Sequence, residues 1–194
     1  VKYWLTFNEH NIFHMPEAFR ISGYLKGEQT LRELYELQHH AMVAHMSLTE
    51  YLHQTKPGQL MGGMLAHQLI YPATCKPRDI FCAQQYDEFL NQNLLRVFAG
   101  QGYSPAVMAV VEQEGFGDIY RDEDLALLAR TKNDFMAFSY YASKTLDSDA
   151  IPEGTPVNYY LLHGEKNNPY LKATEWNWQI DPCLLYTSPS PRDM

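Results

Sequence analysis

The sequence predicts a parallel α/β protein, because short apolar segments alternate with longer segments of helical period. The apolar segments span residues 2–7, 59–66 and 134–140, and each has the length of a β-strand. Between the first two, apolar residues recur at intervals of three and four positions, which indicates an amphipathic helix. The order strand, helix, strand, helix, strand is typical of a parallel α/β barrel.

The first half of the chain contains the best-marked elements. Residues 2–7 are rich in aromatic residues and other residues that favour strands, so we expect a buried strand there. Thr30 and Glu33 have the spacing of a capping box, which predicts that a helix begins at this point. Pro57-Gly58 ends that helix, and residues 59–66 are predicted to form a second buried strand.

The second half is predicted to continue the same alternation. Ser104-Pro105 has the pattern of an N-cap followed by a first-turn proline, which predicts the start of a helix. In chain order we expect a loop from Tyr71, a helix over 78–99, a helix over 105–114, a helix over 122–130, a strand over 134–140 and a long connection over 142–166.

Composition limits the possible partners. The 194 residues are 45% hydrophobic and 20% charged, which is typical of a globular protein. Acidic side chains number 23 against 15 basic ones, and this balance argues against nucleic acid or an anionic membrane surface as a partner. No apolar segment approaches the roughly 18 residues of a membrane-spanning helix. The three cysteines, Cys75, Cys82 and Cys183, fit neither a disulfide set nor a metal pattern, so we expect reduced thiols and a cytoplasmic location.

The eight histidines do not predict a metal site. His39, His40 and His45 lack the spacing that directs two imidazoles at one ion from a helix, and no His-Glu-x-x-His run is present. We therefore interpret them as helix-packing or surface residues, and no metal is expected.

Asn8 and Glu9 lie where the first predicted strand ends. In parallel α/β proteins, ligands and catalytic groups are found at the carboxyl ends of the strands. A carboxylic acid at that position can protonate a leaving group while the neighbouring amide holds the substrate. From the local sequence alone, it is equally consistent that Glu9 only caps the next segment.

Several motifs together resemble family 1 glycoside hydrolases. Tyr3-Trp4-Leu5-Thr6-Phe7-Asn8-Glu9 is similar to the W-x-T-x-N-E-P signature of that family. Four further segments match in order, and the last two resemble the bacterial 6-phospho-β-glucosidase branch in particular: His39 to His45, Asp134 to Tyr141, Asn168 to Ala173 and Glu175 to Pro182.

The resemblance implies a role for four residues. Glu9 would be the general acid/base of a retaining glycosidase, and Asn8 would hydrogen-bond the sugar 2-hydroxyl. Tyr141 would hold the nucleophile through its hydroxyl group. Trp178 would line the leaving-group subsite, although a purely structural role is nearly as consistent with a buried aromatic residue. No cofactor is implied.

The resemblance also has gaps. His10 replaces the usual proline, and Ser139 stands where many relatives have Asn; both changes fit the phospho-specific branch. The nucleophile motif, a strand ending in a Glu-Asn-Gly type run, is absent from this sequence. The loop with Ser, Lys and Tyr that binds the 6-phosphate is absent as well.

We therefore expect residues 1–182 to be part of a (β/α)8 barrel, from about strand four to just past strand six. Residues 183–194, rich in Ser and Pro, are predicted to be a non-native or disordered tail. The predicted function is hydrolysis of a small 6-phospho-β-glucoside, with the isolated chain inactive because the nucleophile strand is missing. The alternatives are a plain β-glucosidase, a 6-phospho-β-galactosidase, or a non-catalytic carbohydrate-binding half-barrel.

Overall fold

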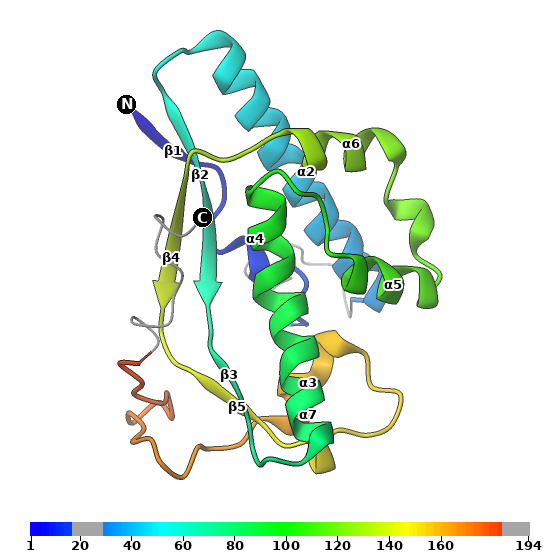
Figure 1. The fold of residues 1–194 in the computed structure, drawn as a ribbon, viewed down its shortest axis with the longest axis vertical. Helices are drawn as coiled ribbons and strands as arrows, with labels where there is room; N and C mark the ends of the chain where they lie inside the picture. The colour runs from blue at the N-terminus through cyan, green and yellow to red at the C-terminus, as the bar shows by residue number, and fades with distance from the viewer. Residues whose placement is uncertain (17–28, 184–194) are drawn as a thin grey trace. The chain divides into compact units, whose positions relative to one another are not determined.

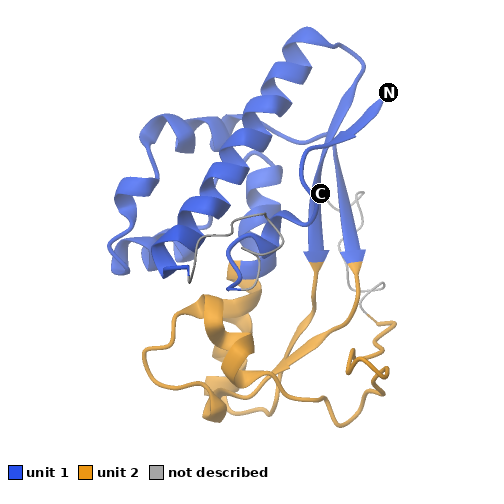
Figure 2. Cartoon of the chain, turned by 180° about the vertical axis from the view of Figure 1, so that it is seen from behind, with its two compact units in different colours: residues 1–66, 90–139 blue, residues 67–89, 140–194 orange. Residues whose placement is uncertain are grey.

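The computed structural model describes residues 1–16 and 29–183 and divides them into two compact units (Figures 1 and 2). Unit 1 comprises residues 1–66 and 90–139, and unit 2 comprises residues 67–89 and 140–194. Each unit is built from two separate chain segments, so no linker in the sequence marks the division. The segments 17–28 and 184–194, which include nearly all of the predicted tail, lie outside the described residues.

Unit 1 contains a three-stranded sheet in the order β1-β2-β4, with its helices on one side of the sheet (Figure 1). β1 and β2 are parallel, and their register pairs Tyr3 with Leu60 and Leu5 with Gly62. The elements of this unit are β1 (Tyr3–Leu5), the 3-10 turn η1 (His10–Ile12), α2 (Leu31–Thr55), β2 (Leu60–His67), α4 (Asn93–Phe98), α5 (Pro105–Gln113), η3 (Gly117–Ile119), α6 (Asp122–Arg130) and β4 (Phe135–Tyr140).

The first helix is the clearest success of the sequence interpretation. Thr30 caps α2, because its side chain accepts a hydrogen bond from the Glu33 backbone N–H while the Glu33 carboxylate accepts one from the Thr30 backbone. The predicted helices at 105–114 and 122–130 are also confirmed, and Ser104 caps the first of them.

The prediction that the first strand is buried was wrong. β1 is only three residues long, and Tyr3, Trp4 and Leu5 are 60%, 41% and 46% exposed. The physical reason is its place in the sheet: β1 is an edge strand, with β2 as its neighbour in the described part of the chain. The prediction for β2 was right, since most of its residues are buried.

The core of unit 1 forms where α2 and α4 pack against the sheet. Gly63 in β2 allows the close approach of α4, because a Cβ there would lie 2.6 Å from the ring of Phe98. The adjacent Gly62 makes room for a residue of β4, since a Cβ there would lie 2.3 Å from the ring of Phe135. The buried side chains are Met42, Met46, Leu65, Leu94, Val97, Phe98, Tyr103, Leu127 and Leu128.

Unit 2 is built around a two-stranded parallel sheet in which Ile70 pairs with Lys144 and Pro72 with Leu146. The loop predicted from Tyr71 and the long connection predicted over 142–166 are thus corrected, because both segments contain regular elements. The elements are β3 (Ile70–Pro72), α3 (Pro77–Asp87), β5 (Lys144–Leu146), η4 (Ser148–Ala150), η5 (Val157–Tyr159) and α7 (Tyr160–Gly164). A π-helical turn, Glu88–Gln92, follows α3 within the helix that was predicted as continuous over 78–99.

A buried carboxylate ties the elements of unit 2 together. Asp79, in the first turn of α3, is fully buried and accepts hydrogen bonds from the Thr74 hydroxyl at 2.5 Å and from the Ser148 backbone and hydroxyl at 3.0 and 2.5 Å. Burial opposes ionisation of this carboxyl, but the bonds from Ser148 and Thr74 outweigh it and lower the pKa of Asp79 to about 2.

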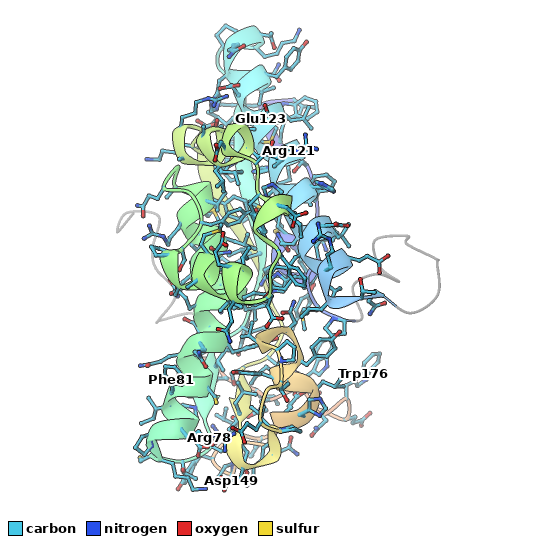
Figure 3. All side chains as sticks on the ribbon, turned by 90° about the vertical axis from the view of Figure 1, so that its right-hand side faces the viewer. Arg78, Phe81, Arg121, Glu123, Asp149 and Trp176 are labelled. Atoms are coloured by element: carbon cyan, nitrogen blue, oxygen red, sulfur yellow. The ribbon has the colours of Figure 1, made fainter. Side chains whose placement is uncertain are left out.

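We expect Asp79→Ala to destabilise unit 2 by roughly 2–3 kcal/mol, because it leaves the two buried donors of Ser148, and the hydroxyl of Thr74, without their acceptor. The matched control is Asp149→Ala, which removes an exposed carboxylate paired with Lys76 at the surface of unit 2 (Figure 3) and costs less than about 1 kcal/mol. Urea unfolding followed by circular dichroism measures both. Equal losses for the two variants would contradict the structural role of Asp79.

Candidate active site

Glu9 lies just beyond the carboxyl end of β1 in an unusual backbone conformation. Its φ and ψ angles are 46° and 62°, the left-handed region that residues other than glycine and asparagine seldom adopt. Its side chain is buried, with 7% of the residue exposed, whereas the preceding Asn8 is exposed. The structure therefore places the two predicted residues at the predicted end of the strand, one buried and one open to solvent.

The two residues after Glu9 attach this turn to β2. His10 Nδ1 donates a hydrogen bond to the Met64 carbonyl at 2.9 Å. Asn11 makes two bonds to a single residue: its Nδ2 donates to the Ala66 carbonyl and its Oδ1 accepts from the Ala66 N–H, each at 2.8 Å. The turn that carries Glu9 is thus fixed to the central strand of the sheet.

A chain of hydrogen bonds continues from His10 into the core. The Thr6 hydroxyl lies 3.3 Å from His10 Nε2 and 2.7 Å from His45 Nδ1, and His45 Nε2 lies 2.8 Å from Asn133 Nδ2. His10 and His45 are fully buried, and their rings are 4.6 Å apart at the centroids, each set edge-on to Phe98.

The positions of the protons in this series of hydrogen bonds follow from the groups at its two ends, the Met64 carbonyl and the Asn133 amide. Burial lowers the pKa of His10 to about 4 and that of His45 to about 3, so both rings are neutral at pH 7. His10 must carry its proton on Nδ1, because a carbonyl can only accept, and its Nε2 then accepts from Thr6. Thr6 in turn accepts from His45 Nδ1, and His45 Nε2 accepts from the Asn133 amide. In this arrangement every ring nitrogen has a partner.

Tyr141 and Trp178, the other two predicted residues, lie together in unit 2. Their rings meet edge-to-face with centroids 5.6 Å apart, and they are 45% and 42% exposed. Trp176, 78% exposed, contacts Trp178 at 6.0 Å and lies at the surface (Figure 3). Half-exposed rings can stack on a sugar, so these exposures are consistent with the predicted subsite.

Asp181 holds the segment that carries Trp178 in place. Its Oδ2 accepts from the Tyr71 hydroxyl at 2.8 Å, and its backbone exchanges hydrogen bonds with the Tyr140 hydroxyl. Burial, together with the Asp181 carboxylate, raises the pKa of Tyr71 to about 12, so this hydroxyl is a donor at neutral pH. The structure thus brings the predicted residues together in two pairs, Asn8 with Glu9 in unit 1 and Tyr141 with Trp178 in unit 2.

Sequence reasoning missed the residues that support Glu9. Thr6, His10 and His45 stand inside the motifs that carry the family resemblance, but nothing in their spacing shows that their side chains meet. The interpretation of the helix histidines as packing or surface residues is confirmed, since His39 and His45 are buried and His40 is exposed. Among residues 1–16 and 29–183, no group of three His, Cys, Asp or Glu side chains is arranged to hold a metal ion.

A hollow in unit 1 of about 580 Å³ does not contain any of the predicted residues. Its lining includes two paired sets of charges, Arg130 with Glu50 and His53 with Asp134, at 2.9 and 2.8 Å. Asp134 also accepts from the Met61 backbone, near the start of β2, whereas the turn carrying Glu9 attaches near its end. We therefore assign the candidate active site to the Glu9 turn and not to this hollow.

These features define a parallel α/β protein that carries a buried carboxylate just beyond the carboxyl end of a strand. The family model described as "Glycosyl hydrolase family 1" matches residues 1–188. The chain belongs to glycosyl hydrolase family 1.

The chain is similar to bacterial phospho-β-glucosidases over part of their length. It is 35% identical to the aryl-phospho-β-D-glucosidase BglH of Bacillus subtilis, over 94% of this chain and 38% of that protein. It is 33% identical to the 6-phospho-β-glucosidase AscB of Escherichia coli, over 95% of this chain and 38% of that protein. The chain thus spans less than half of the curated relatives that it matches.

Solved structures support the fold. The chain superposes on a family 1 glycoside hydrolase of Thermotoga maritima with a TM-score of 0.73 at 21% identity, over 96% of this chain and 39% of that one. For the AHE enzyme of Alicyclobacillus herbarius the TM-score is 0.74 at 24% identity, over 96% and 40%. In the part of the chain that the structure describes, no helix is both long and apolar enough to cross a membrane.

Proposed function

We propose that this chain is the acid/base-bearing part of a retaining β-glycosidase that hydrolyses 6-phospho-β-glucosides. The observation that carries the proposal is the placement of Glu9: a buried carboxyl at the end of a parallel strand, fixed by its neighbours, in a family 1 chain. The phosphorylated substrate is proposed from the relatives, whose names describe phospho-β-glucosidases.

In this mechanism Glu9 acts twice. It first donates a proton to the glycosidic oxygen as the bond to the anomeric carbon breaks and a second carboxylate attacks that carbon. It then removes a proton from the water that releases the sugar from the enzyme. Retaining glycosidases need the two carboxyl groups roughly 5–5.5 Å apart.

The other candidate residues act on binding and orientation. Asn8, exposed beside Glu9, would hydrogen-bond the sugar 2-hydroxyl, a contact that strengthens in the transition state. Tyr141 would orient the nucleophile carboxylate through its hydroxyl, and Trp178 would stack on the leaving group. The edge-to-face contact between these two rings supports a shared role, because each limits the rotation of the other.

The experiment compares the isolated 194-residue chain with the intact protein, obtained by reading the DNA on both sides of the segment that encodes it. The intact protein is expected to hydrolyse p-nitrophenyl 6-phospho-β-glucoside at least about 100-fold faster, by kcat/KM, than the unphosphorylated glucoside. This ratio is the loss expected when buried phosphate-binding groups are left unpaired. The isolated chain should show no turnover of either. A higher kcat/KM for the unphosphorylated glucoside would overturn the phospho-specific assignment, and turnover by the isolated chain would contradict the need for a second carboxylate from elsewhere.

A further inference from the structure

The edge of β2 that faces β1 is completed by side chains. The Leu60 N–H donates to the Lys2 carbonyl, so alternate residues of β2 from Leu60 onward present their backbone groups to this edge. The backbone of β1 pairs along it only as far as Gly62. The next two positions, Met64 and Ala66, receive the hydrogen bonds of His10 and Asn11 instead.

Asn11 replaces a peptide group in this arrangement. Its amide donates to the carbonyl and accepts from the N–H of the same residue, Ala66, with both distances at 2.8 Å, as a neighbouring strand would do. Asn11 is fully buried, so the two groups of Ala66 depend on it and not on water. His10 satisfies the carbonyl of Met64, and both side chains belong to the turn that directly follows Glu9.

The backbone of Glu9 needs such support. A left-handed conformation is unfavourable for glutamate, and among the described residues the other non-glycine residue with positive φ is Asn177, a residue type that tolerates it. The chain is held before Glu9 by the Thr6 hydroxyl, which bonds to both His10 and His45, and after it by His10 and Asn11. The conformation is therefore fixed from both sides.

We propose that His10 and Asn11 are positioning residues for Glu9: by continuing the hydrogen-bond ladder of β2 with their side chains, they hold the left-handed turn that directs the Glu9 carboxyl. The inference rests on the proposed function for its catalytic meaning. A misplacement of about 1 Å in a proton donor costs on the order of 100-fold in rate. The hydrogen bonds of His10 and Asn11 therefore affect catalysis through the backbone of Glu9.

The test compares Asn11→Ala with Asn93→Ala. Asn93 is a matched control, since it is also buried in unit 1 and its Oδ1 accepts from a backbone N–H, that of Ser104, at 2.8 Å. In the isotopically labelled chain, the HN–Hα coupling and the Cα and Cβ shifts of Glu9 report its backbone. We expect Asn11→Ala to abolish the left-handed signature and Asn93→Ala to preserve it.

Kinetics of the intact protein supply the second readout. Asn11→Ala should lower kcat by at least about tenfold while KM changes less than about twofold, because orientation of the acid is lost and sugar binding is kept. Asn93→Ala should leave kcat within about twofold. Should Asn11→Ala fail to fold, Asn11→Asp keeps the acceptor for the Ala66 N–H, removes the donor, and is measured in the same way.

A Glu9 signature that stays left-handed in Asn11→Ala or Asn11→Asp would overturn the inference, as would an equal fall in kcat for Asn93→Ala. The backbone measurement needs no turnover. It can therefore fail while Glu9 still behaves as the acid/base, and it can succeed even where the proposed reaction is disproved.

Discussion

Glu9→Gln in the intact protein is expected to lower kcat for p-nitrophenyl 6-phospho-β-glucoside by about 10²–10⁴-fold. The amide has the shape of the carboxyl group, so the buried turn is retained while the proton that assists the leaving group is lost. The assay is steady-state release of p-nitrophenol near neutral pH. Glu123→Gln is the control, since its carboxylate is 76% exposed on α6 (Figure 3), and it should leave kcat unchanged.

The dependence on the leaving group separates a lost proton donor from a damaged fold. A dinitrophenyl glycoside needs little protonation, so Glu9→Gln should form the glycosyl-enzyme at nearly the normal rate and then accumulate it, because the general base for its hydrolysis is also missing. This predicts a burst of phenol release. Azide, which attacks without a general base, should speed the slow step and give a β-glycosyl azide. Equal losses for both leaving groups, with no effect of azide, would assign Glu9 a structural role only.

The sequence could predict those features that depend on neighbouring residues. The capping box of Thr30 and Glu33 lies within four positions, and its hydrogen bonds form wherever the helix starts. The strand end that carries Asn8 and Glu9 was likewise predictable, since the apolar run stops there.

Features that depend on distant partners were not predictable. β3 and β5 are three residues each and are stabilised by pairing with one another, with Ile70 against Lys144, so neither has a strand pattern of its own. The exposure of β1 follows from its position at an edge, which local hydrophobicity does not encode. The supporting residues of Glu9 have the same origin. Thr6 follows β1, His45 lies on α2 and Asn133 precedes β4, so their side chains meet only in the folded chain.

The buried histidines predict that unit 1 loses stability in mild acid. Unfolded histidine has a pKa of about 6.5, whereas burial lowers the pKa of His10 to about 4 and that of His45 to about 3. Between these values the unfolded chain binds protons that the folded chain does not. The free energy of unfolding is therefore highest above pH 6.5 and falls as the pH drops toward 4. For His10 alone the loss by pH 4 is roughly 3 kcal/mol. His45 adds to it, because burial and the neighbouring His10 ring lower the pKa of His45 as well.

Urea unfolding of the chain between pH 7.5 and 4.5, followed by circular dichroism, measures this loss above the range in which most carboxylates titrate. His45→Gln offers an amide to Thr6 and Asn133 without a titratable ring, so it should flatten the pH dependence even though it costs some stability at pH 7. His53→Gln is the control, because that ring is 35% exposed and its partner, Asp134, is a residue of the surface hollow and not of the buried histidine pair. His14 is also buried, with a pKa lowered to about 4 and Gln38 beside it. His45→Gln should therefore reduce the slope of the free energy of unfolding against pH without abolishing it. A slope that His45→Gln leaves unchanged would show that the pair His10–His45 is not neutral in the folded chain, and the proton arrangement derived for Thr6 would then be wrong.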